Sequence, residues 1–359
     1  MYGFYQSQEG FMKKRISQSQ MAKELGVSQS LVSLVLNGRR EGISEESYDR
    51  VWLMAAQKGY VPRGMQPMHA PEVQHSYVGV VLRSGLELAA QSNTFSHVRQ
   101  GLFSVLQHSN ISVAFLGGEG DLDERKLFEL LGRRDPLLGI VVLGEVKEDF
   151  MQALGGLKLK LVSVYASSPG LCNSVVPNEK QAVRMLVDHL VKLGHTRFAW
   201  LGGNCRLGRN HARFAALKQC LAERGLPLDE RHVVDFEQGD RQDGFESAAE
   251  LMRRTGKKDL PTAWVCHNGL MARGSLQFTF VQGIKVPEEV SVVAIDRTRA
   301  CAEIHPYLTS AASDPQVIGE EAAKLLCKSA VESAGQEMCI DLVVPSLFDR
   351  GETSGICAR

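Results

Sequence analysis

Residues 16–38, ISQSQMAKELGVSQSLVSLVLNG, decide how the first part of the chain folds. Ser17 and Gln20 have the spacing of a capping box, in which two polar side chains satisfy the free amides at the start of a helix. Gly26 predicts the end of that helix, because glycine readily adopts the left-handed conformation found there. The stretch therefore predicts a short helix that stops at Gly26 and a second helix that begins at once.

The second helix is predicted from Ser28 to Asn37-Gly38. Its apolar residues recur at helical spacing and predict one buried face, made of Val32, Val35 and Leu36. The side chains then expected on the outside are Gln29, Ser30, Ser33 and Leu34. A third helix is predicted from Ile43 to Gly59, because acidic residues in its first turn favour a helix start.

Two helices around a glycine turn, followed by a third helix, are typical of a helix-turn-helix unit. Side chains near the start of its second helix reach base edges in the major groove of DNA. Gln29 occupies that place, and glutamine can form two hydrogen bonds with adenine. The alternative is an ordinary helical cap whose Ser and Gln side chains are only hydrated. The spacing favours double-stranded DNA as a partner.

The formal charge of the chain is zero, but it is unevenly distributed. Residues 1–64 carry nine Lys or Arg and six acidic residues, a net charge of +3, so the other 295 residues sum to −3. A basic first segment is expected where one end of a protein meets a polyanion. Chance scatter explains the charge difference equally well when charge is taken alone.

The composition places the chain among globular proteins, with 44% hydrophobic and 23% charged residues. No apolar run reaches the roughly 18 residues of a membrane span, and residues 1–14 lack the layout of a secretory signal. The eight cysteines show no metal-site spacing and are interpreted as reduced thiols. We therefore expect a cytoplasmic protein with no membrane partner, catalytic residues, metal or cofactor.

After residue 76, short apolar runs alternate with longer amphipathic stretches. Strands are predicted at 78–82, 113–116, 139–143, 161–164, 197–201, 233–236, 263–266 and 290–295. Helices are predicted at 95–106, 124–131, 179–193, 209–224, 244–254 and 270–282. This alternation indicates parallel sheets with helices on both faces. The number of units favours two doubly wound sheets, and a (β/α)₈ barrel is the competing arrangement.

The first region is similar to the DNA-binding head of the lactose-repressor (LacI/GalR) family. The similar segments are 21–28, 32–38, 43–46 and 59–62. The resemblance implies DNA contacts by Ser28, Gln29, Ser30, Ser33, Leu34 and Asn37. Among these, Gln29 and Ser30 match the base-reading positions. Leu34 stands where the family usually has arginine, so we expect an operator that differs from the common family sequence.

In that family, the segment after the head usually forms a hinge helix that inserts an apolar wedge into the minor groove. The corresponding segment here is RGMQPMHAP, residues 63–71. Two prolines and one glycine disfavour a helix, so we expect a flexible tether. Met65 and Met68 are the candidate wedges if a hinge helix forms on DNA.

The rest of the chain is similar to the effector-binding domain of the same family. The similar segments are 178–190, 193–195, 199–203, 225–229 and 286–296. The resemblance implies an α/β periplasmic-binding-protein-like body of two doubly wound lobes joined by three crossings, following the all-α helix-turn-helix head. The implied parts are an extension at 1–14, the head at 15–62, a linker at 63–76 and a body at 77–350. Lobe 1 would hold 77–176 and 316–335, and lobe 2 would hold 177–312 and 340–348.

A cleft between such lobes would bind a small polar effector. The resemblance implies effector contacts by Phe95, Tyr165, Arg213, Asn268, Asp296 and Asp314. For Arg213 and Asp296 the alternative is a structural ion pair between the lobes, and for Phe95 it is a core position. Gly269 and Arg297 replace two aspartates that are usual in the family. These replacements shift the expectation from a neutral sugar toward an anionic or differently substituted ligand.

The leading hypothesis is a homodimeric transcriptional regulator, acting as a repressor, whose operator affinity is controlled by a sugar or related metabolite. A solute-binding protein of the same fold is the second hypothesis, and the head argues against it. An enzyme is the third. The sequence contains no dinucleotide-binding fingerprint after a strand, no phosphate-binding loop of the P-loop type and no nucleophile elbow.

Overall fold

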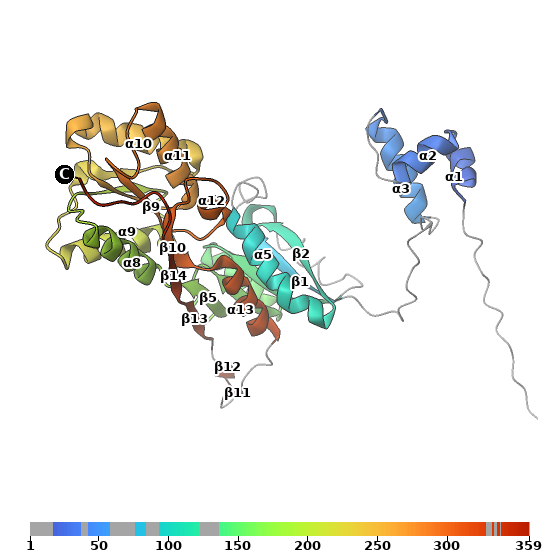
Figure 1. The fold of residues 1–359 in the computed structure, drawn as a ribbon. Helices are drawn as coiled ribbons and strands as arrows, with labels where there is room; N and C mark the ends of the chain where they lie inside the picture. Colours follow the sequence, from blue (N-terminus) through green and yellow to red (C-terminus); the bar gives the residue numbers. More distant parts are fainter. Residues whose placement is uncertain are drawn as a thin grey trace, which may run out of the picture. The chain divides into compact units, whose positions relative to one another are not determined.

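The computed structural model describes residues 17–36, 42–57, 76–83, 93–122, 136–327, 332–333, 336–337 and 339–358. The chain divides into two units, Met1–Val73, here called the head, and Gln74–Arg359, here called the body (Figure 1). Across these residues, the helices are all too short or too polar to cross a membrane. Asn37, Met65 and Met68, three of the predicted DNA-contacting residues, lie outside them.

The described part of the head contains three helices, α1 (Gln18–Leu25), α2 (Gln29–Leu36) and α3 (Glu45–Gln57). The capping box is present, since the Ser17 amide donates to Gln20 Oε1 at 2.9 Å and the Gln20 amide donates to Ser17 Oγ at 3.1 Å. Gly26 ends α1 at a φ of 68°, the left-handed conformation predicted from the sequence. Ser28 Oγ accepts from the Leu31 amide at 3.2 Å and begins α2.

The head is held together by a small apolar core to which all three helices contribute. Its buried residues are Met21, Ala22, Val32, Val35, Leu36, Val51 and Ala55. The predicted inward face of α2 is therefore confirmed. The opposite face, at the start of α2, leaves Gln29 and Ser30 exposed and Leu34 41% exposed.

The body contains two six-stranded sheets. The first, in lobe 1, has the strand order β13-β5-β4-β3-β1-β2, and its neighbouring strands run parallel. Its strands are β1 (Ser76–Leu82), β2 (Ile111–Gly118), β3 (Leu137–Leu143), β4 (Lys160–Val164), β5 (Asn173–Pro177) and β13 (Asp341–Val344).

The second sheet, in lobe 2, has the order β14-β10-β9-β8-β6-β7. It is parallel except for β14, which pairs antiparallel with β10. Its strands are β6 (Phe198–Gly202), β7 (Val233–Asp235), β8 (Ala263–Cys266), β9 (Ser291–Ala294), β10 (Thr309–Ser313) and β14 (Ser346–Asp349). Two separate open sheets exclude the (β/α)₈ barrel.

Helices cover both faces of each sheet, because alternate residues of every strand point to opposite faces. In lobe 1, α5 (Asn93–Leu106) and α13 (Pro315–Cys327) pack on one face and α7 (Glu148–Gly156) on the other. In lobe 2, α8 (Glu179–Lys192) and α9 (Gly208–Ala222) cover one face. The other face carries α10 (Arg241–Thr255) and α11 (Gly269–Val281).

The other elements of the described residues are short. They are the 3₁₀ turns η1 (Gln107–Ser109), η2 (Glu119–Asp121), η3 (Glu230–His232) and η4 (Lys257–Asp259), the helix α12 (Arg299–Ala302) and the strand pair β11 (Glu332–Ser333) and β12 (Gln336–Glu337). The predicted helix at 124–131 lies outside the described residues.

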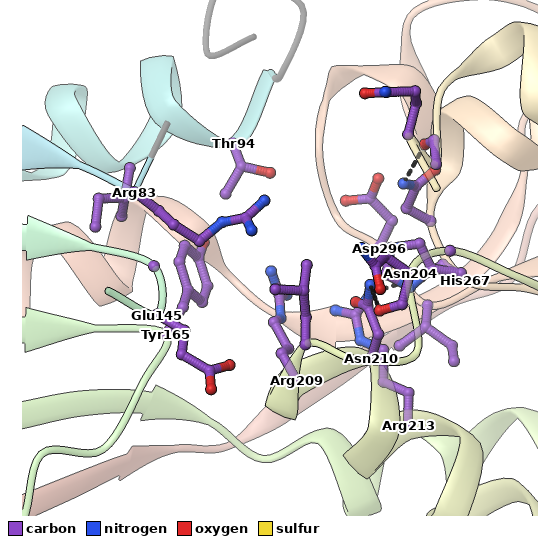
Figure 2. A pocket seen from close by; sticks show the side chains of 18 of the residues that line it. Arg83, Thr94, Glu145, Tyr165, Asn204, Arg209, Asn210, Arg213, His267 and Asp296 are labelled. Carbon is purple, nitrogen blue, oxygen red and sulfur yellow. Dashed lines mark hydrogen bonds between the residues drawn. The ribbon is translucent and has the colours of Figure 1, made fainter. Parts of the chain in front are cut away.

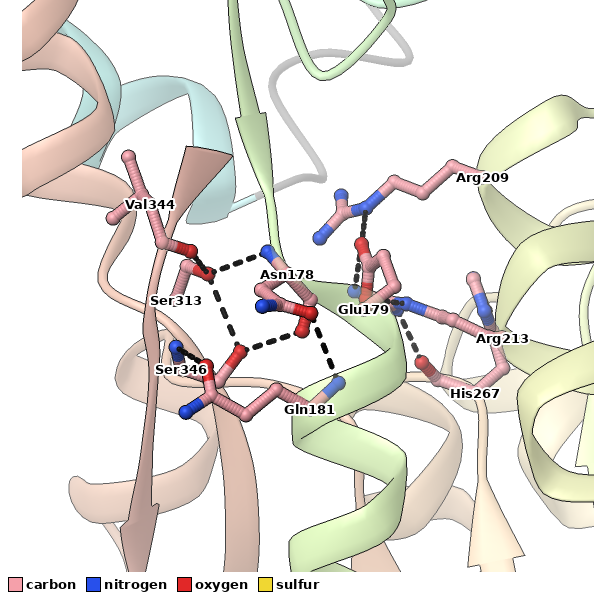
Figure 3. A network of polar contacts seen from close by, with 9 residues as sticks. All are labelled: Asn178, Glu179, Gln181, Arg209, Arg213, His267, Ser313, Val344 and Ser346. Carbon is pink, nitrogen blue, oxygen red and sulfur yellow. Dashed lines mark hydrogen bonds and ion pairs between the residues drawn. The ribbon is translucent and has the colours of Figure 1, made fainter. Parts of the chain in front are cut away.

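The chain passes between the lobes three times, after β5, after β10 and after β13. Hydrogen bonds join the three crossings to one another (Figure 3). Ser313 Oγ donates to the Val344 carbonyl at 2.6 Å, and Ser346 Oγ donates to the Asn178 carbonyl at 2.8 Å. The backbone amide of Asn178 donates to both Ser313 Oγ, at 3.1 Å, and the Val344 carbonyl, at 3.0 Å. Relative movement of the lobes must therefore bend all three crossings at one place.

The prediction that residues 340–348 form a single last strand of lobe 2 is wrong. Residues 341–344 form β13 of lobe 1, and residues 346–349 form β14 of lobe 2. Pro345 lies between them, and proline lacks the amide that would continue a strand's hydrogen bonds. The third crossing therefore lies inside the predicted strand.

Candidate functional site

An open cleft of about 340 Å³ lies between the two lobes of the body (Figure 2). Most of its lining follows the carboxyl ends of strands, which is where ligands bind in open parallel sheets. Lobe 1 contributes Arg83 after β1, Glu145 after β3 and Tyr165 after β4. Thr94 and Phe95, in the first turn of α5, complete this wall.

The wall from lobe 2 is more polar. It consists of residues that follow β6, β7, β8 and β9 and of the first turns of α9. They are Gly203, Asn204, Leu207, Arg209, Asn210, Arg213, Glu237, Gln238, Gly239, His267, Asn268, Ile295 and Asp296. Such a mixture of amides, guanidinium groups and carboxylates can bind a small polar molecule.

Glu179, the first residue of α8, holds two arginines of α9 in place (Figure 3). Arg213 Nε donates to Glu179 Oε2 at 2.6 Å, and Arg213 Nη1 donates to the His267 carbonyl at 2.6 Å. Arg209 Nε donates to Glu179 Oε1. Burial opposes ionisation of Glu179, but the two guanidinium groups outweigh it and lower the pKa of this carboxyl. Arg213 is therefore part of an ion pair within lobe 2, not between the lobes.

Among the described residues, a hydrogen bond and a cation–π contact connect the lobes across the cleft. Glu145 Oε2 accepts a hydrogen bond from the Gly208 amide at the start of α9, at 2.7 Å. The guanidinium carbon of Arg209 lies 4.3 Å from the centre of the Tyr165 ring, a cation–π contact. Tyr165 has a φ of 69°, an unusual conformation for a residue other than glycine. Such strain is concentrated at functional sites.

His267 is 9% exposed, and no partner for its Nδ1 is found among the described residues. Burial, together with Arg213 and Arg209, lowers the pKa of His267 well below its ordinary value. The imidazole is therefore neutral at physiological pH. An uncharged ring nitrogen beside the cleft can accept or donate one hydrogen bond, depending on its tautomer.

Asn268 and Asp296 line the cleft but are already engaged in lobe 2. Asn268 Oδ1 accepts from the Met271 amide at 2.8 Å and caps α11, and its Nδ2 donates to the Gly239 carbonyl at 2.7 Å. Asp296 accepts from the Gly269 amide and from the amide and hydroxyl of Thr298, at 2.8–3.0 Å. Both side chains shape the cleft wall and retain only part of their bonding capacity for a ligand.

Asp314 is placed differently from the prediction, because it does not line the cleft. Its Oδ1 accepts from the Gln316 amide at the start of α13, and its Oδ2 accepts from Arg297 Nη1 at 3.3 Å. Arg297 also donates to Asp349 Oδ2 at 2.6 Å. Arg297 is thus paired beside a lobe crossing, and the expectation that it changes the charge of the cleft is wrong.

The structure brings Phe95, Tyr165, Arg213, Asn268 and Asp296 together around the cleft, as the resemblance implied. Polar residues that sequence reasoning missed are Arg83, Thr94, Glu145, Asn204, Arg209, Asn210, Glu237, Gln238 and His267. The signal that could have found most of them is position, because they follow the carboxyl ends of predicted strands or begin a predicted helix.

The bond between Glu145 and the start of α9 leads to a prediction. Replacing Glu145 with alanine should raise the rate of hydrogen exchange at the Gly208 amide about tenfold, because a charge-assisted hydrogen bond across the cleft contributes roughly 1.5 kcal/mol. Hydrogen-exchange mass spectrometry of peptides that cover residues 204–212 measures this exchange rate. Glu148→Ala is the matched control, since Glu148 is exposed on α7 of the same lobe. Equal exchange in the parent and Glu145→Ala would contradict the cross-lobe bond.

The lowered pKa of His267 makes the stability of the body depend on pH. Because the folded pKa lies below the unfolded value of about 6.5, the unfolded state binds more protons, and stability falls as pH drops below ~6.5. The urea midpoint should fall between pH 7.5 and 5.5, and His267→Gln should reduce this fall. The control is His211, which is exposed. The urea midpoint of His211→Gln should fall with pH as much as that of the parent. If the urea midpoint of His267→Gln fell with pH as much as that of the parent, His267 would not be a source of the pH dependence.

The described residues of the predicted DNA-reading surface lie together at the start of α2. Ser28, Gln29 and Ser30 are exposed there, and Ser33 is partly buried. The Ser28 oxygen accepts from a backbone amide, which leaves its hydrogen available to donate. Exposed polar side chains at the amino end of the second helix are the arrangement that a helix-turn-helix unit needs to reach bases and phosphates.

The fold and the cleft define a class of protein, a two-lobed small-molecule-binding body of the periplasmic-binding-protein type preceded by a helix-turn-helix unit. Residues 187–351 match the family model of the periplasmic binding protein-like domain. The chain is 21% identical over 336 residues to the HTH-type transcriptional repressor PurR of Erwinia tasmaniensis, covering 92% of this chain and 94% of that protein. It is 26% identical over 316 residues to catabolite control protein A of Priestia megaterium, covering 86% of this chain and 90% of that protein.

Solved structures of similar fold include two with a DNA-binding or ligand-bound description. One is the lac repressor dimer bound to operator and the anti-inducer ONPF, with a TM-score of 0.65, 21% identity and coverage of 95% of this chain and 100% of that one. The other is the transcriptional regulator CelR in complex with cellobiose, with a TM-score of 0.65, 20% identity and coverage of 94% and 100%. Along most of its length the chain is thus similar to DNA-binding transcriptional regulators, and its fold is that of the lac repressor.

Proposed function

We propose that this protein is a repressor that binds a palindromic operator as a homodimer and changes its operator affinity when a small metabolite enters the cleft. The observation that carries the proposal is the presence, on one chain, of an exposed helix-turn-helix surface and a polar cleft between two hinged lobes. A solute-binding protein would need only the second of these.

In the head, Gln29 is the residue proposed to read bases. It is exposed, lies at the first position of α2 and carries both a donor and an acceptor. Ser28, Ser30 and Ser33 are proposed to contact phosphates or base edges, and Leu34 to contact an apolar group such as a thymine methyl. Asn37 and the linker methionines, Met65 and Met68, remain proposals from the family resemblance.

In the body, ligand binding is proposed to act through the angle between the lobes. A ligand that touches both walls favours the closed arrangement over the open one by its differential affinity. Closure bends the three crossings, whose hydrogen bonds meet at Asn178, Ser313 and Ser346. Domain closure around a ligand is a common means of switching. The proposed effector is a sugar or related metabolite, as the cellobiose bound by CelR suggests.

The homodimer is supported by large apolar side chains on the surface of the body. Phe103 on α5 is 54% exposed, and Phe280 and Val281 at the end of α11 are 85% and 61% exposed. Exposed apolar residues of this size mark surfaces for association. A two-fold dimer would present two heads to a DNA site that is itself a palindrome.

Selection of bound duplexes from a random pool, with the full-length protein, tests the proposal. We expect enriched duplexes with two inverted half-sites, and an affinity that falls steeply with salt because phosphate contacts release counterions. Adding pooled sugars and metabolites should shift that affinity. A solute-binding protein would enrich no sequence, and that outcome would overturn the proposal.

A further inference from the structure

Two arginines face the cleft from opposite lobes. Arg83 follows β1 in lobe 1, is exposed, and extends its guanidinium group into the space between the lobes (Figure 2). Among the residues that the structure describes, none forms an ion pair or hydrogen bond with this guanidinium. With respect to the described part of the chain, Arg83 therefore keeps its five donors for a ligand.

Arg209 stands on the opposite wall, in the first turn of α9. Its Nε is bonded to Glu179, and its flat face lies on the Tyr165 ring, so the side chain is held in one orientation. Its two terminal nitrogens have no hydrogen-bond partner among the described residues, and the side chain is 29% exposed. A guanidinium group held by packing on one side and open on the other is preorganised to bind an anion.

The carboxylates near these arginines are already engaged. Glu179 is shared between Arg209 and Arg213, and Glu145 accepts from the Gly208 amide. Asp296 accepts from one hydroxyl and two backbone amides within lobe 2. Glu237 is the remaining lining carboxylate, and it is exposed beyond β7. Among the described residues, the guanidinium of Arg83 and the terminal nitrogens of Arg209 thus have no carboxylate partner, while Arg209 Nε is paired with Glu179.

The rest of the lining suits an uncharged, hydroxylated group. Thr94 offers a hydroxyl from the start of α5. His267 offers a neutral imidazole whose Nδ1 is buried and unpartnered in the described part of the chain. Asn210 donates its amide hydrogen to the Asn204 carbonyl at 2.9 Å, which orients its oxygen as an acceptor.

We propose that the effector is a small metabolite with one oxyanion group, a phosphate or a carboxylate, which bridges Arg83 and Arg209 across the cleft. This inference rests on the proposed function, because it names the chemical class of the effector. Guanidinium groups bind such anions through charge-assisted, paired hydrogen bonds. Without the anion the two like charges repel each other across the cleft, and with it both are attracted to one group. The anion therefore contributes directly to closure.

The test uses the full-length protein without DNA and inorganic phosphate as the probe. Millimolar phosphate should raise the thermal unfolding midpoint relative to chloride at equal ionic strength, since a ligand that binds only the folded state stabilises it. Arg83→Gln and Arg209→Gln should each weaken the apparent phosphate affinity at least tenfold. Arg231→Gln is the matched control, because Arg231 is exposed and paired with Asp229 away from the cleft, and should retain the parent affinity.

Glucose, glucuronate and glucose 6-phosphate then form a series that separates the two sources of an oxyanion. Stabilisation by either charged sugar above the level given by glucose, lost in Arg83→Gln, supports the proposal and identifies carboxylate or phosphate. No stabilisation of the parent by inorganic phosphate would overturn it. Stabilisation that persists in Arg83→Gln and Arg209→Gln means an adventitious ion only, and also overturns it.

Failure of this inference is distinguishable from failure of the proposed function. Phosphate binding is measured on the full-length protein without DNA and depends on the cleft of the body, whereas duplex selection depends on the head and its Gln29 surface. A protein that selects a palindrome but ignores phosphate would keep the repressor assignment and overturn only the anionic effector. A protein that binds phosphate at the arginines but selects no duplex would keep the anion site and overturn the repressor assignment.

Discussion

Replacing Glu179 with glutamine should lower the free energy of unfolding of the body by about 3–5 kcal/mol, the usual cost of breaking a buried ion pair by removing one partner. Glu179 is 9% exposed and Arg213 is 2% exposed, so water screens the charges of this pair only weakly in the folded state. The substitution leaves Arg213 charged and facing an amide that no longer balances it. Urea denaturation followed by the fluorescence of Trp200 and Trp264, both buried in lobe 2, measures the change.

Glu250 provides the control for this experiment. It also contacts two arginines, Arg253 and Arg254, but on the solvent side of α10, where water screens the charges. Glu250→Gln should leave the urea midpoint close to that of the parent. A similar midpoint for the Glu179 and Glu250 variants would show that the buried network does not stabilise lobe 2.

Replacing Gln29 with alanine should lower the affinity for the selected operator on the order of 10–100-fold, because one bidentate contact to a base contributes ~1–3 kcal/mol of discrimination. The affinity for random duplexes should stay the same, since Gln29 is uncharged and releases no counterion. Fluorescence anisotropy with operator and scrambled duplexes at one fixed salt concentration measures both values.

Ser19→Ala is the control for the DNA measurement. Ser19 is exposed on α1, outside the helix that is proposed to read bases, so this variant should bind both duplexes like the parent. Equal losses on operator and scrambled duplexes in Gln29→Ala would mean that Gln29 does not read bases. The base-reading role would then have to pass to another side chain of α2.

Local signals in the sequence were sufficient for the head. The capping box of Ser17 and Gln20, the left-handed Gly26 and the buried face of α2 all involve residues within about four positions of one another. The alternation of strands and helices in the body is likewise a local pattern. The short strands β5 and β10 were missed because they contain Ser174, Thr309 and Ser310, polar residues that become buried through long-range contacts.

The cleft was predicted only in part. The family resemblance pointed to Arg213, Asn268 and Asp296, which do line it, but not to the partners that hold them in place. It also pointed to Asp314, which pairs with Arg297 at a lobe crossing. Whether an arginine is open to a ligand or bound by a carboxylate depends on which distant residue lies beside it.

The sequence by itself determined the head and the alternation of strands and helices, because short-range periodicity, caps and spacing carry that information. Only the tertiary structure decided that residues 340–348 divide between two sheets at Pro345. It alone showed that Glu179 holds Arg209 and Arg213, and that Arg83 and Arg209 face one cleft. These relations join residues of different strands and lobes, and their electrostatics depend on separations and burial that appear only when the chain is folded.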